Sequence, residues 1–158
     1  MSTAHISQVI ANSYLFDANA FIDVGERFYP DDIFGCLWKN ISQALTNGSV
    51  VTCKGVLGEL KKAPIQLPWR QKIQMACQNS AINESDADIQ KVFARLAGLS
   101  ISKGVGNVDR WVLSAGEARS LPIVTRDGPM FEVARRGHSF ARLLTPTDFF
   151  REVGWSFP

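Results

Sequence analysis

Short apolar segments alternate along the chain with longer segments of helical periodicity, and this alternation limits the folds open to it. The apolar segments end at turn-forming residues and predict strands; they span residues 13–16, 50–53, 122–125 and 142–144. Strands that alternate with helices favour a mainly parallel sheet covered by helices on both faces, an α/β fold. Ligands in such sheets bind beyond the carboxyl ends of the strands.

The helical segments are marked by apolar residues every three or four positions and by capping residues at their ends. Ile33, Leu37, Ile41 and Leu45 recur every four positions, which predicts an amphipathic helix that ends at the glycine after Asn47. The pattern predicts further helices over residues 54–62, 69–78, 85–97, 107–118 and 129–136, and one from residue 146. We expect the N-caps of three of them to be Ser85 or Asp86, Asn107, and Thr145.

Composition narrows the class of protein. The 158 residues, 46% hydrophobic and 20% charged, suit a single globular domain, expected over residues 1–158 with its core at about 13–155. The three cysteines and two histidines are too dispersed for a zinc site and favour a reducing cytoplasm over a disulfide framework. We expect neither a membrane span nor a secretion signal.

Acidic residues occupy comparable positions near the predicted strand ends. Asp17 directly follows the first strand, and Glu59 lies in the helix after the second. Asp109 is in the first turn of a helix, and Asp127 follows the third strand. Held close together, these carboxylates would repel one another and raise each other's pKa unless a cation lay between them. Oxygen-only ligands of this kind suit Mg²⁺ or Mn²⁺.

Each acid alone also has a structural interpretation. Asp17 can cap the following helix, and Glu59 can pair with Lys62 on a solvated face. Asp109 is favoured by the helix dipole without any ligand, and Asp127 precedes a glycine in an ordinary turn. Only the four acids together favour a common site.

An ordered set of motifs resembles a known family. The stretches DANAFI, GEL, NVDRWVLSAG, IVTRDGPMF and TPTDFF resemble the motifs of the PIN-domain nucleases, including VapC-type toxins. The stretch RFYPDD followed by FGCLW is similar to a PIN-like branch of mostly uncharacterised bacterial proteins. The resemblance implies a three-layer α/β/α sandwich and a compact acidic site for one or two Mg²⁺ or Mn²⁺ ions. Residues 61–107 resemble the family least.

The resemblance also implies roles for individual residues. Asp17, Glu59, Asp109 and Asp127 match the catalytic acids that hold the metal, directly or through water, and Asn19 and Thr125 match small polar residues around the site. The activity implied is a metal-dependent endoribonuclease, the RNA-cutting toxin of a toxin–antitoxin pair, with an antitoxin partner and a homodimeric state. The alternative is a catalytically silent PIN-like module that binds RNA or a protein.

Three further conclusions follow from the residues themselves. Arg126, Arg135 and Arg136 lie within ten positions of Asp127 and could grip RNA phosphates. An aspartyl phosphatase of the haloacid dehalogenase type is excluded, since its second aspartate would stand where this chain has Asn19. The tryptophans at helical spacing, Trp38, Trp69 and Trp111, are expected to pack rather than to stack on bases.

Overall fold

A parallel sheet lies at the centre of the molecule. The structure is a computed structural model that describes residues 12–27, 35–62, 68–99 and 104–155. In these ranges the strands pair in the order β2-β1-β3-β4, all parallel. Their bounds are β1 Tyr14–Phe16, β2 Val50–Val51, β3 Ile123–Val124 and β4 Leu143–Leu144. The predicted parallel α/β architecture is confirmed, with β1 and β3 as its inner strands.

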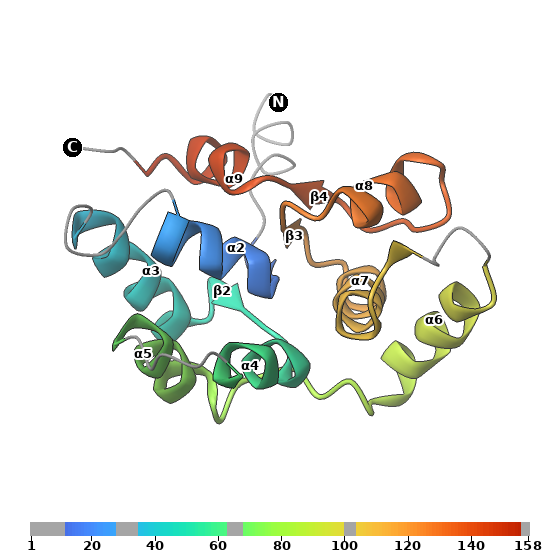
Figure 1. Ribbon diagram of the computed structural model, residues 1–158, viewed down its shortest axis with the longest axis horizontal. Coiled ribbons are helices and arrows are strands. Elements are labelled where there is room, and N and C mark those ends of the chain that lie inside the picture. Colours follow the sequence, from blue (N-terminus) through green and yellow to red (C-terminus); the bar gives the residue numbers. More distant parts are fainter. Residues whose placement is uncertain (1–11, 28–34, 63–67, 100–103, 156–158) are drawn as a thin grey trace, which may run out of the picture.

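Helices flank the sheet. Helix α2 (Ala18–Ile22) follows β1 and continues as a π-helical turn, η1 (Asp23–Arg27). The remaining helices are α3 Gly35–Asn47, α4 Lys54–Lys61, α5 Pro68–Cys77, α6 Ala87–Ala97, α7 Asn107–Arg119, α8 Gly128–Arg135 and α9 Pro146–Val153. Figure 1 shows α3 and α5 on one side of the strands and α6 on the other, with α7 beside β3. No helix within the described ranges is both long and apolar enough to cross a bilayer.

Aromatic rings fill the core next to β1. Phe16 packs against Phe21 of α2 and against Phe149 of α9, with ring centroids 5.1 and 5.0 Å apart. All three rings are at most 1% exposed, so the first strand, its following helix and the last helix share one hydrophobic layer. Edge-on contacts between aromatic rings add to the free energy gained by burial itself.

The tryptophans pack as expected from their spacing. Trp38 of α3 lies against Trp69 of α5, with centroids 5.6 Å apart. Trp111 of α7 stacks on Phe93 of α6 at 3.6 Å. The two pairs therefore join α3 to α5 and α6 to α7.

The strands are shorter than predicted, although backbone groups just outside them still bond to neighbouring strands. Ser13 lies outside β1 and its hydroxyl donates to the carbonyl of Gly48. Thr52 lies outside β2 and its hydroxyl donates to the Phe16 carbonyl, while Cys53 forms only an isolated bridge to Ile82. The strands β3 and β4 likewise lose one or two predicted end residues: Pro122, Thr125 and Arg142.

Apart from the starts of α3 and α6, the helix bounds agree with the sequence patterns to within one residue. Helix α3 ends before Gly48, whose φ of +83° suits glycine, and α9 is capped by Thr145, as predicted. The expected cap Asn107 is wrong: the N-cap of α7 is Gly106, and Asn107 is the first helical residue. Ile33, at the predicted start of α3, lies outside the described residues.

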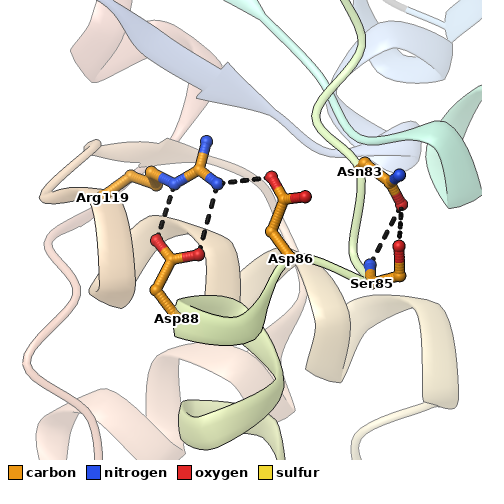
Figure 2. Close-up of polar contacts among 5 residues, drawn as sticks. All are labelled: Asn83, Ser85, Asp86, Asp88 and Arg119. Carbon is orange, nitrogen blue, oxygen red and sulfur yellow. Dashed lines mark hydrogen bonds and ion pairs between the residues drawn. The ribbon is translucent and has the colours of Figure 1, made fainter.

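The predicted start of α6 also needs correction. The helix begins at Ala87 rather than Ser85, and Asp86, one of the two predicted caps, occupies the N-cap position, although its side chain makes no capping hydrogen bond. Instead the guanidinium of Arg119, at the end of α7, bonds to Asp86 and to Asp88, at 2.6 and 2.8 Å. Figure 2 shows Arg119 between these two carboxylates, while the Ser85 hydroxyl turns to Asn83.

Candidate functional site

Asp17 lies at the carboxyl end of β1, at the N-terminus of α2. Its Oδ1 accepts a hydrogen bond of 2.8 Å from the backbone N–H of Ala18. Its Oδ2 accepts one of 2.8 Å from the hydroxyl of Thr125, just beyond β3. The residue is only 1% exposed. The capping interpretation is thus confirmed, and the same carboxylate also faces the end of the neighbouring strand.

Thr125 and Asn19 connect the two strand ends. The Thr125 hydroxyl lies 3.0 Å from Oδ1 of Asn19 and accepts the backbone N–H of Asp127 at 3.1 Å. Oδ1 of Asn19 also accepts the backbone N–H of Arg126 at 3.1 Å. The structure therefore places both predicted supporting residues against Asp17. These hydrogen bonds also hold residues 125–127 against the N-terminal turn of α2.

The acids that follow later in the chain meet near this point. Asp127 is the N-cap of α8, and its Oδ1 accepts the backbone N–H of Met130 at 3.1 Å. Asp109, in the first turn of α7, lies close enough to Asp127 for that carboxyl group to raise the pKa of Asp109. Asp109 and Asp127 are therefore direct neighbours.

The electrostatics link these acids to Asp17 and Glu59. Burial, helped by the charges of Asp127 and Glu59, raises the pKa of Asp17 to about 6, although the hydrogen bonds from Thr125 and from the Ala18 N–H act to lower it. Burial also raises the pKa of Asp109 to about 8, helped by Asp17, Asp127 and Glu59. For Glu59 itself, burial raises the pKa and the nearby Lys62 lowers it. The charge of Lys62 thus acts on Glu59, and the charge of Glu59 acts on Asp17 and Asp109.

The donor chemistry of this cluster fits a hard divalent cation. Carboxylates from β1, α4, α7 and β3 supply only oxygen, and their mutual repulsion would be relieved by positive charge. Among the described residues, no three acidic, histidine or cysteine side chains stand at the spacing needed to hold one ion together. Mg²⁺ commonly keeps several waters and takes only one or two carboxylates directly, so the arrangement suits an ion held partly through water.

The predicted cationic residues divide into two groups. Arg126 follows Thr125 at the site, with Nε 3.6 Å from Oδ2 of Asp23. Arg135 and Arg136 lie at the far end of α8, roughly 12 Å along the helix from Asp127. Both pair with Glu132. Only Arg126 lies beside the acids.

Asp23 is a residue of the site region that sequence analysis missed. Its side chain is 4% exposed and lies near Arg126. The π-helical turn that begins at Asp23 is a rare geometry that recurs at functional sites. A second aspartate shortly after Asp17, following two large apolar residues in DANAFID, was the available signal.

Comparison with known proteins gives the family. A family model described as a domain of unknown function, DUF4411, matches residues 14–137. The chain belongs to this family. A search of curated proteins found no match.

Two solved structures share the fold of this family member. One is the crystal structure of FitAcB from Neisseria gonorrhoeae, with a TM-score of 0.57 and 17% identity, covering 85% of this chain and 98% of that chain. The other is VapBC2 from Rickettsia felis bound to a DNA fragment from their promoter, with a TM-score of 0.53 and 17% identity, covering 84% and 97%. At such identity the likeness shows the fold, a PIN-like α/β/α sandwich.

Proposed function

We propose that this chain is a metal-dependent endoribonuclease that cleaves phosphodiester bonds in RNA. The observation that carries the proposal is the convergence of Asp17, Asp109 and Asp127 from three separate elements, with Glu59 close enough to raise the pKa of Asp17 and of Asp109. Clusters of acids with raised pKa values are characteristic of functional sites. The acids, rather than a covalent nucleophile, would then organise the reaction.

Each residue has a defined part in this proposal. Asp17 and Asp109 would hold Mg²⁺ or Mn²⁺, and Glu59 and Asp127 would complete its shell directly or through water. When bound, such an ion activates a water molecule and stabilises the charge on the transferring phosphate. The Thr125 hydroxyl keeps Asp17 oriented through its 2.8 Å hydrogen bond. Arg126, at the rim, would bind a phosphate that flanks the scissile bond.

The biological role we propose is that of the toxin in a toxin–antitoxin pair. The similar structures, FitAcB and VapBC2, are named as two-component assemblies, which supports a cognate antitoxin partner for this chain. We further propose a homodimer and a cytoplasmic location, where the free thiols of Cys36, Cys53 and Cys77 would stay reduced. Light scattering at micromolar concentration tests the dimer, and a monomer there contradicts it.

A catalytically silent PIN-like module is the second candidate. It is favoured by the absence, among the described residues, of three acids at direct metal-ligand spacing. Such a module would bind RNA or a protein partner without cleaving the RNA.

One experiment separates the two candidates. A mixed RNA pool is incubated with the wild type, with Asp109→Asn and with Asp148→Asn, in Mn²⁺ and in EDTA. Asp148 is an exposed acid in the first turn of α9, far from the cluster in sequence, and serves as the matched control. The nuclease proposal expects cleavage by the wild type and the control in Mn²⁺ only. Binding without cleavage by all three proteins identifies the silent module.

A further inference from the structure

We propose that the side-chain amide of Asn19 is a substrate-binding group, whose Nδ2 donates hydrogen bonds to a non-bridging phosphate oxygen of the RNA. The inference rests on the proposed function. It gives Asn19 a direct contact with substrate in addition to its bonds within the protein.

The hydrogen bonds around Asn19 fix which way its amide faces. A backbone N–H can only donate, so the atom that meets the Arg126 N–H at 3.1 Å is the oxygen Oδ1. The Thr125 hydroxyl approaches the same oxygen at 3.0 Å. The Nδ2 group is therefore the opposite corner of the amide, turned away from Thr125 and Arg126. Its orientation is set by the protein before any ligand arrives.

The two N–H groups of Nδ2 remain available for a ligand. Among the described residues, neither meets a hydrogen-bond acceptor, although Asn19 is partly buried. The amide is also close to the acids, because Asn19 and Asp17 share the hydroxyl of Thr125 as a hydrogen-bonding neighbour. The side chain that carries this donor is thus linked through the single hydroxyl of Thr125 to the carboxylate that we assign to the metal.

A neutral donor suits this position better than a cation. An anionic phosphate approaching several carboxylates needs hydrogen-bond donors to offset repulsion. A lysine or arginine here would pair with Asp17 and compete with the metal for it. An amide carries no charge, yet it forms a charge-assisted hydrogen bond with a phosphate oxygen. The chain has the neutral Asn19 at this point, whereas the guanidinium of the neighbouring cation, Arg126, lies against Asp23.

Two substitutions separate the donor from the acceptor of the amide. Asn19→Asp keeps an oxygen for Thr125 and Arg126 but removes both N–H donors, whereas Asn19→Ala removes donor and acceptor. We measure kcat/KM for a short single-stranded RNA in Mn²⁺ at low and high salt, and Mn²⁺ affinity by calorimetry. Asn40→Asp, in α3, is the control for added negative charge.

We expect both Asn19 variants to lose roughly ten- to hundredfold in kcat/KM, the effect of one hydrogen bond to a charged group. For Asn19→Asp, we expect the loss in kcat/KM to persist at high salt, because salt screens only the effect of the added charge. We expect Asn19→Ala to bind Mn²⁺ with an affinity within about twofold of the wild type. The control Asn40→Asp should keep the wild-type kcat/KM. Wild-type activity in Asn19→Asp overturns the inference, because it would show that activity needs only the oxygen that accepts hydrogen bonds from Thr125 and Arg126, and not the Nδ2 donors. A loss that high salt abolishes, or a parallel loss of Mn²⁺ affinity in Asn19→Ala, also overturns it.

A measurement on the wild type keeps the inference testable if the variants do not fold. In ¹⁵N-labelled full-length protein, the side-chain N–H signals of Asn19 are followed as the same RNA is added with Ca²⁺ in place of Mn²⁺. We expect them to shift with saturation, and unchanged signals in the presence of bound RNA overturn the inference. If the wild type cleaves no RNA in Mn²⁺, the proposed function fails, and these signals still decide whether Asn19 contacts phosphate.

Discussion

Thr125 and Asp17, 108 positions apart in the sequence, are joined by a buried hydrogen bond of 2.8 Å between the threonine hydroxyl and the carboxylate Oδ2. This bond links the ends of the two inner strands, β1 and β3. It gives Asp17 two structural partners, since Oδ1 already accepts the N–H of Ala18. A carboxylate that caps a helix can therefore also face the acidic cluster.

The first prediction concerns Asp17→Asn. Asparagine is about as good a helix cap as aspartate, and the Thr125 hydroxyl can turn its proton to Asn19. We expect the variant to fold and, without metal at pH 8, to melt at the wild-type temperature or above it, because one buried charge is gone. RNA cleavage and Mn²⁺ affinity should fall by at least roughly 10- to 100-fold, the usual effect of altering a metal site.

The measurement for Asp17→Asn is paired: thermal melting with and without Mn²⁺, and cleavage of an RNA pool. Asp148→Asn is the control, as the same chemical change at an exposed acid of α9. An active wild type together with an equally active Asp17→Asn removes Asp17 from the metal site.

The second prediction is that the metal-free protein loses stability as pH rises from about 4 to about 8. The folded-state pKa values of Asp17 and Asp109 lie above 3.8, their ordinary value, at about 6 and about 8. Within that window the folded state holds protons that the unfolded state has released, so the free energy of unfolding falls with rising pH. Each proton held contributes a slope of ~1.4 kcal/mol per pH unit. Below about pH 4, Asp17 and Asp109 are protonated in both the folded and the unfolded state, so their contribution to the free energy of unfolding no longer changes with pH.

Urea unfolding at a series of pH values in EDTA measures this slope. Asp17→Asn should flatten it between pH 4 and 6, the interval in which Asp17 titrates. Saturating Mn²⁺ should weaken the decline, because a bound cation offsets the repulsion and stabilises the folded state by mass action. A wild-type slope equal to that of Asp17→Asn contradicts the burial of this charge.

The third prediction concerns the arginines. If Arg126 binds a phosphate, Arg126→Ala should reduce the slope of log K against log salt for single-stranded RNA by about one unit. Arg135→Ala and Arg136→Ala, combined, should reduce it by less than two units, because Glu132 already pairs with both side chains. Arg151→Ala, on the exposed face of α9, is the control. An unchanged slope after Arg126, Arg135 and Arg136 are all replaced excludes them from RNA binding.

The fourth prediction compares two helical glycines. A Cβ added at Gly116 of α7 would clash with Cδ1 of Ile123, so Gly116→Ala should destabilise the fold by about 1–3 kcal/mol through overpacking. A Cβ at Gly58 of α4 would meet no atom within 4 Å, so Gly58→Ala should stabilise by up to about 1 kcal/mol. Urea unfolding gives both values. Equal effects of the two substitutions would show that α7 does not pack closely on β3.

Sequence patterns predicted the order of strands and helices, because burial periodicity and strong local caps such as Thr145 depend on nearby residues. They failed where a distant group replaced a local one. Asp86, one of the two expected caps of α6, holds the N-cap position, but its carboxylate bonds to Arg119, 33 positions away, and not to the helix. The four acids could be proposed from sequence, whereas the proximity of Asp109 to Asp127 and the burial of Asp23 required the fold.

The strand order also has a consequence for synthesis on the ribosome. The strand β1 emerges first and pairs with β2, but its other neighbour, β3, is made only after residue 122. Until then Asp17 lacks its Thr125 partner, and Asp127 does not yet exist. A growing chain thus cannot assemble the acidic cluster before residue 127 has been made, and any activity that depends on the cluster can begin only after that point.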